Sequence, residues 1–187
     1  LLPALAEAGC EWHFTDLSPR FLDAATQRFG AIPGFKARRL DIEAEPGDQG
    51  FVPESYDLVV AANVLHATRD LAATLDRAAA LVAPGGLLVL LEGTVPRAWV
   101  DVTFGLTEGW WRFADDRTDG PLVSGATWRG LIAAAGLEPA LLPVGDDLLY
   151  GQSVVIGRRT TVSPGVAGPI LLVGDAKGPA ERIAQAL

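Results

Sequence analysis

The fold class is set by the stretch YDLVVAANVLH, which runs from Tyr56 to His66. Its first seven residues form a near-continuous apolar run, which is typical of a strand buried on both faces of a parallel sheet. A second run of this kind, Leu87–Leu91, is followed by Glu92. Two buried strands at this spacing leave room for one helix between them, so the stretch predicts a strand–helix–strand unit.

Strand and helix signals alternate along the rest of the chain. Asp70 is a helix cap in the sequence pattern, and Pro84-Gly85-Gly86 is a helix stop. Strands are expected at 11–15, 36–40, 56–62, 87–91, 138–143 and 152–157, and helices at 19–29 (capped by Ser18), 71–82 and 127–135. This order predicts an α/β fold with a mostly parallel sheet and an antiparallel C-terminal hairpin. In such sheets, ligands bind at the carboxyl ends of the strands.

Composition narrows the function classes. The 187 residues carry a net charge of −8 and no long basic run, which makes nucleic acid a poor partner. No apolar run is long enough to cross a membrane. Cys10 is the single cysteine, so we expect no cysteine metal cluster, no other metal site and a cytoplasmic setting. There is no Met, even at position 1, which leads us to expect a piece of a longer protein.

Two carboxylates follow predicted strands. Asp16 stands where a carboxylate can accept hydrogen bonds from both hydroxyls of a ribose, or where it merely caps the next helix. Asp41 can accept from an adenine amino group, or serve as a turn residue. Position alone leaves both pairs of interpretations open.

His66 and Glu92 each follow a buried strand. If the two strands are neighbours, the side chains meet at one edge of the sheet. Glu92 would then fix the imidazole tautomer and leave the other ring nitrogen of His66 to act as a general base. The alternative is a structural hydrogen bond without chemistry.

An aromatic insert follows Glu92. It includes Trp99, Trp110, Trp111 and Phe113, together with the glycine-flanked stretch Gly105–Gly109. We interpret it as a lid that keeps water from an acyl substrate, with plain packing as the alternative.

Five segments together resemble the C-methyltransferase domains of type I polyketide synthases. The Pro-Gly-Gly strand is shared by many class I methyltransferases, whereas the Asn-Val-Leu-His-Ala-Thr and Gly-Trp-Trp segments are more specific. The likeness runs over about residues 1–157, and it is carried by Phe14–Ser18, Leu40–Glu43, Ser55–Thr68, Ala83–Thr94 and Gly105–Trp111.

This resemblance implies a Rossmann-like fold and an S-adenosylmethionine-dependent reaction. His66, paired with Glu92, would remove the α-proton of a β-ketoacyl thioester on an acyl carrier protein, and the enolate would take the methyl group. The implied cofactor-binding residues are Asp16 (ribose), Asp41 and Ile42 (adenine end) and Asn63, and the implied lid residues are Trp110, Trp111 and Phe113. The implied partners are the carrier protein and neighbouring synthase domains.

One departure from the family is that its first strand and Gly-rich loop precede the region that begins at Leu1. We expect the chain alone to be inactive without them. Either the rest lies elsewhere, or the domain is a degenerate remnant, or a strand at Ile170–Val173 fills the gap.

The domain prediction is a methyltransferase domain over 1–157, a linker over 158–168, and the start of a ketoreductase-type domain over 169–187. Two other functions remain open. One is a noncatalytic pseudo-methyltransferase that braces its neighbours, and the other is an O- or N-methyltransferase acting on a small molecule.

Overall fold

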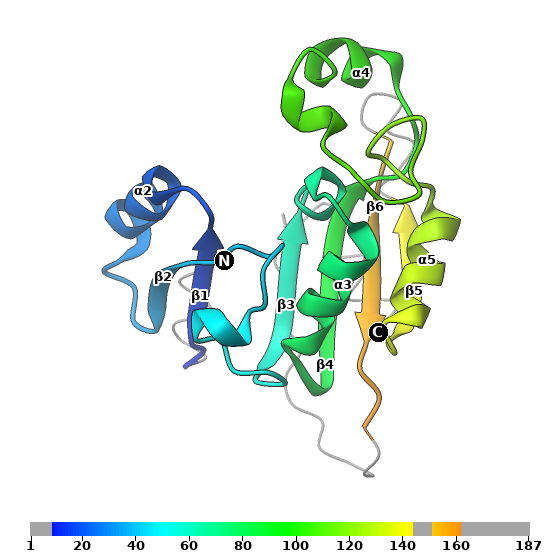
Figure 1. The fold of residues 1–187 in the computed structure, drawn as a ribbon. Coiled ribbons are helices and arrows are strands. Elements are labelled where there is room, and N and C mark those ends of the chain that lie inside the picture. The colour runs from blue at the N-terminus through cyan, green and yellow to red at the C-terminus, as the bar shows by residue number, and fades with distance from the viewer. Residues whose placement is uncertain (1–8, 144–150, 162–187) are drawn as a thin grey trace. The chain divides into compact units, whose positions relative to one another are not determined.

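The computed structural model describes residues 9–143 and 151–161, which belong to two compact units divided after Gly50 (Figure 1). The loop that joins the strands expected at 138–143 and 152–157, with Gly145-Asp146-Asp147 in it, lies outside the described residues, as do the strand expected at 170–173 and the expected start of a following domain.

The first unit is a β–α–β element. Strands β1 (Trp12–Asp16) and β2 (Phe35–Arg39) pair in parallel, with Trp12 opposite Phe35 and Asp16 opposite Arg39. Helix α2 (Pro19–Phe29) connects them, and η1 (Gly47–Gln49) follows. Ser18 takes the N-cap position, but its side chain makes no capping bond. Its backbone N–H instead donates to Asp16 Oδ1 at 2.7 Å, so the carboxylate orders the turn into α2.

The second unit is a four-stranded sheet in the order β3-β4-β6-β5. Strands β3 and β4 are parallel, and β6 is antiparallel to both β4 and β5, which confirms the predicted C-terminal hairpin. Helices α3 and α5 lie on the same face of this sheet in Figure 1. The bounds are β3 Tyr56–Ala62, α3 Leu71–Ala80, β4 Val82–Gly93, α5 Gly125–Ala134, β5 Glu138–Pro143 and β6 Gln152–Arg158.

The predicted end of the helix after Asp70 is wrong. Helix α3 stops at Ala80, and β4 already begins at Val82, so Pro84-Gly85-Gly86 lies inside the strand. The pairing between β3 and β4 shifts register in this region. A Cβ on Gly86 would stand 2.8 Å from the Asp57 carbonyl oxygen, so the glycine is needed where the two strands approach each other closely.

Strand β3 is less buried than its apolar sequence predicts. Its residues are half-buried or exposed, and Val60 is 48% exposed. Within the described part of the chain, β3 pairs with β4 on one side only, and an edge strand has fewer neighbours to cover it. Strand β4, with partners on both sides, is buried over most of its length.

The core of the second unit lies between the sheet and its two helices. Its large side chains that are at most 1% exposed include Trp128 and Ile132 of α5, Leu75 of α3, Leu88 and Leu90 of β4, and Val155 of β6. Burying one large apolar side chain contributes roughly 1.5–3 kcal/mol. This packing holds β4, and therefore the residues at its carboxyl end, in place.

The aromatic insert, for which no helix is expected from the sequence, contains helix α4 (Ala98–Phe104) and the short helix η3 (Glu108–Trp111). It stands beyond the carboxyl ends of β3 and β4 (Figure 1). A further short helix, η2 (Leu65–Ala67), follows β3 and carries His66.

Candidate active site

The side chains of His66 and Glu92 meet at the carboxyl ends of β3 and β4. The parallel register places Ala62, the last residue of β3, opposite Leu91, so the segment that follows β3 lies beside Glu92, the penultimate residue of β4. Nδ1 of His66 lies 2.6 Å from Oε2 of Glu92. Glu92 is completely buried, and the His66 side chain is 12% exposed. A short contact of this kind, shielded from water, holds the imidazole in one orientation.

The second oxygen of Glu92 fixes the backbone that carries the histidine. Oε1 accepts hydrogen bonds from the N–H groups of Val64, at 3.2 Å, and Leu65, at 3.0 Å. A carboxylate that accepts these bonds also accepts from Nδ1–H, so we assign the His66 proton to Nδ1. In the described part of the chain, Nε2 makes no hydrogen bond, which leaves its lone pair available to take a proton.

Asn63 occupies the turn between β3 and η2. It has a left-handed backbone, with φ of 54°, which asparagine tolerates better than most residues. Its N–H donates to the Leu91 carbonyl oxygen at 2.8 Å, and its Oδ1 accepts from Nε2 of Gln152 at 3.1 Å. The side chain is exposed and keeps its own amide hydrogens available for a ligand.

The other predicted cofactor-binding residues lie in the first unit. Asp16 ends β1 and is half-buried; its Oδ1 accepts from Ser18, and its Oδ2 has no hydrogen bond within residues 9–50. Asp41 is fixed by Gln49, which accepts from its N–H and donates to its carbonyl oxygen, both at 2.8 Å. Its Oδ1 accepts from Glu43 N–H. Ile42 is half-buried. Each aspartate thus has a turn role and, within residues 9–50, a spare oxygen that can accept a hydrogen bond.

The predicted lid residues differ from one another in their surroundings. Trp110 is 8% exposed, and its ring meets the His66 ring edge-on, with centroids 6.0 Å apart, while Phe104 stacks on it at 5.6 Å. Trp111 is 51% exposed and donates through Nε1 to the Gly105 carbonyl oxygen. Phe113 is half-buried, with the Arg117 guanidinium 5.1 Å from its ring centre. Trp110 is therefore the lid residue whose ring contacts His66.

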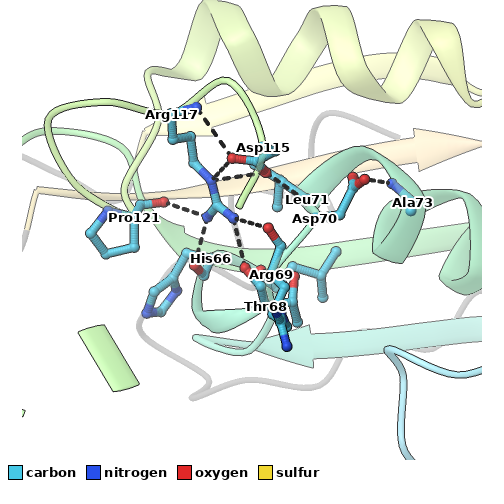
Figure 2. Close-up of polar contacts among 10 residues, drawn as sticks. His66, Thr68, Arg69, Asp70, Leu71, Ala73, Asp115, Arg117 and Pro121 are labelled. Atoms are coloured by element: carbon cyan, nitrogen blue, oxygen red, sulfur yellow. Dashed lines mark hydrogen bonds and ion pairs between the residues drawn. The ribbon is translucent and has the colours of Figure 1, made fainter. Parts of the chain in front are cut away.

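Sequence reasoning missed Arg117 and Asp115. The side chain of Arg117 is 7% exposed and donates to the carbonyl oxygens of His66, at 2.7 Å, and Thr68, at 2.6 Å (Figure 2). Asp115 accepts from Nε of Arg117 and from the Leu71 N–H. Burial alone would raise the pKa of Asp115, but hydrogen bonds from Arg117 and from Leu71 N–H outweigh that cost and hold it below its ordinary value of 3.8. The run Asp115-Asp116-Arg117 gave no signal in sequence, since charged loop residues are usually solvated.

Other site types find no support in the described residues. No group of three or more His, Cys, Asp or Glu side chains within 9–143 and 151–161 could hold a metal ion. Within the same residues, no helix is both long enough and apolar enough to span a bilayer. A cavity of about 510 Å³ is lined by Asp115, Arg117 and Pro121 among others, and neither His66 nor Glu92 lines it.

The sequence matches known methyltransferases. Residues 1–88 match the family model described as a methyltransferase domain. Polyketide synthase ThaQ of Burkholderia thailandensis is 44% identical over 161 residues, which cover 84% of this chain and 8% of that protein. The chain therefore spans a small part of this curated relative.

Solved structures agree in fold. The CurJ carbon methyltransferase superposes with a TM-score of 0.74 at 39% identity, covering 81% of this chain and 42% of that one. The trans-methyltransferase CalH, solved in complex with SAH, gives a TM-score of 0.74 at 38% identity, covering 80% and 43%. The predicted class I methyltransferase fold is confirmed, and the chain belongs to the methyltransferase domains of polyketide synthases, in the class I methyltransferase superfamily.

Proposed function

We propose that this domain uses S-adenosylmethionine to methylate the α-carbon of a β-ketoacyl thioester carried by an acyl carrier protein. The observation that carries the proposal is the contact between Nδ1 of His66 and Oε2 of the buried Glu92. Methylation on carbon requires removal of a proton from that carbon. A histidine with one nitrogen tied to a carboxylate and the other unpaired is suited to that task.

In this mechanism Nε2 of His66 takes the α-proton of the substrate. Glu92 holds Nδ1–H and stabilises the imidazolium that forms, because a buried carboxylate interacts strongly with a neighbouring cation. Trp110 covers one side of the imidazole and limits the access of water. S-adenosylmethionine, when bound, supplies the electrophilic methyl group that the enolate carbon accepts.

The proposed cofactor-binding residues are Asp16 for the ribose hydroxyls, Asp41 and Ile42 for the adenine, and Asn63 for the methionine portion or the substrate. The spare oxygens of the two aspartates support this assignment. Trp111 and Phe113 complete the proposed lid with Trp110. The proposed partners are the carrier protein and neighbouring synthase domains, in the cytoplasm.

The test compares His66→Ala with the wild type in the full-length protein. Acetoacetyl-loaded acyl carrier protein is the substrate, mass spectrometry follows methyl transfer, and calorimetry measures S-adenosylmethionine binding. We expect transfer to fall by about 10²–10⁴-fold, the range of a general base, with binding kept. Methyl transfer at the wild-type rate by His66→Ala would show that His66 is not the base. A wild type that binds the cofactor and methylates only free alcohols or amines would support an O- or N-methyltransferase instead.

A further inference from the structure

Arg117 also holds the loop of His66, through carbonyl oxygens rather than through the N–H groups that Glu92 binds. All five N–H groups of its guanidinium donate hydrogen bonds. Nε donates to both oxygens of Asp115, at 2.7 and 3.0 Å, Nη1 to the carbonyl oxygens of His66 and Pro121, and Nη2 to those of Thr68 and, at 3.5 Å, Arg69. Figure 2 shows the guanidinium facing these carbonyl groups while the His66 ring points away from it.

Two buried charges of opposite sign therefore fix one short segment. Glu92 accepts from the N–H groups of Val64 and Leu65 and from the His66 ring, whereas Arg117 donates to the carbonyl oxygens of His66 and Thr68. Thr68 closes the turn internally, since its Oγ1 donates to the Leu65 carbonyl oxygen at 2.7 Å. Helix η2 is only three residues long and could not hold a catalytic ring in place by itself.

The same contacts join the aromatic insert to the base. Ala114 N–H donates to the Arg69 carbonyl oxygen at 2.7 Å, and Asp115 accepts from Leu71 N–H at 2.8 Å. Residues 114–117 come directly after Phe113, the last aromatic residue of the insert, so the guanidinium of Arg117 links the end of the insert to the backbone of His66.

We propose that Arg117, held by Asp115, is a positioning residue for the methyl-transfer reaction, which sets where the imidazole of His66 stands relative to the substrate α-carbon. The inference rests on the proposed role of His66 as base. A planar guanidinium with five donors can hold several carbonyl groups in a fixed geometry at once, whereas the single ammonium of lysine cannot. Small displacements of a catalytic group, on the order of 1 Å, can cost about 10²-fold in rate.

The test uses Arg117→Gln, Arg117→Lys and Asp115→Asn in the full-length protein. Arg159→Gln is the matched control, because Arg159 also donates to a carbonyl oxygen, that of Ala79, and its backbone pairs with Gly86 in the early part of β4, away from His66. Arg117 borders the cavity, so water can reach the carbonyl groups that a shorter side chain leaves behind, which limits the loss of stability.

Three quantities are measured: kcat, the KM for S-adenosylmethionine, and the exchange of the substrate α-proton with deuterium when no cofactor is added. The last isolates the step performed by His66. We expect Arg117→Gln to lower kcat and the enzyme-dependent exchange together, by about 10- to 100-fold, with KM unchanged. Arg117→Lys and Asp115→Asn should lower kcat and the exchange rate by a smaller factor. Arg159→Gln should have the kcat and exchange rate of the wild type.

Wild-type kcat and exchange in a folded Arg117→Gln protein would overturn the inference. If that variant does not fold, the test rests on Arg117→Lys and Asp115→Asn. A reduced exchange rate with an unchanged KM in either variant supports the positioning role. A wild-type exchange rate in both variants overturns it. His66→Ala is run beside them. An active His66→Ala protein would defeat the proposed function, whereas an inactive one beside a fully active Arg117→Gln protein would defeat only the role of Arg117.

Discussion

Replacing Glu92 by glutamine would separate its two tasks, that of holding the loop and that of orienting the base. The amide oxygen of the introduced side chain can still accept from the N–H groups of Val64 and Leu65, so the loop should keep its shape. The amide nitrogen would face Nδ1 of His66, and it can only donate. The imidazole would then lose its charge-assisted bond and favour the tautomer with the proton on Nε2, which cannot act as a base.

The size of the effect follows from the bond that is lost. A hydrogen bond to a charged group has a net value of about 1.5–3 kcal/mol, and 1.36 kcal/mol changes a rate tenfold, so we expect kcat to fall by roughly 10- to 150-fold. This is a smaller loss than we expect for His66→Ala, because the imidazole remains present. The KM for the cofactor should stay the same.

The assay is steady-state methyl transfer to acetoacetyl-loaded carrier protein across pH, with thermal unfolding to verify the fold. Glu54→Gln is the control, since Glu54 is exposed, precedes β3 and pairs loosely with Arg159 at 3.6 Å. If Glu92→Gln turned over at the wild-type rate, the orienting role of Glu92 would be refuted, and its three hydrogen bonds would have to be purely structural.

Two other variants test the cofactor site and the helix that follows the loop. Asp16→Asn should weaken S-adenosylmethionine binding by roughly 10- to 150-fold in calorimetry, since the charged acceptor is lost while the bond to Ser18 can be kept. The control is Asp23→Asn, because Asp23 is exposed on α2. An unchanged affinity in Asp16→Asn would show that Asp16 does not bind the cofactor. Asp70→Ala should lower the free energy of unfolding by about 0.5–2 kcal/mol in denaturant titration, because Asp70 Oδ1 caps α3 through Ala73 N–H. The exposed Asp76, in mid-helix, is its control, and an equal loss in Asp76→Ala would contradict a capping effect.

Local signals were sufficient for three of the four strands of the second unit, whereas β4 was predicted over 87–91 and spans Val82–Gly93. The apolar run predicted β3 at its observed bounds, Tyr56–Ala62, and the stretch Glu138–Pro143 likewise. The Pro-Gly-Gly segment was wrongly predicted to end a helix, because glycine both ends helices and permits the close approach of strands. Only the pairing of this segment with β3 distinguishes the two roles. The helices α4 and η3 of the insert were not predicted either, because they are too short for a helical repeat of apolar residues to be recognised in the sequence.

The candidate site was predictable where it depended on parallel strands. That His66 and Glu92 come together follows from two neighbouring strands ending at one edge. The Arg117 contacts were not predictable, because their partners are backbone carbonyl groups, which every residue has. A side chain that binds backbone carbonyl oxygens requires no particular residue types in the segment that it holds.

The most direct test of the central claim is to locate the transferred methyl group. The full-length protein would be given S-adenosylmethionine with an isotopically labelled methyl group and acetoacetyl-loaded carrier protein, and the released product analysed by NMR. We predict that the label is bonded to the α-carbon, between the two carbonyl groups, and that His66→Ala yields none. A label found on oxygen or nitrogen, or an equal yield from His66→Ala, would contradict carbon methylation by this histidine.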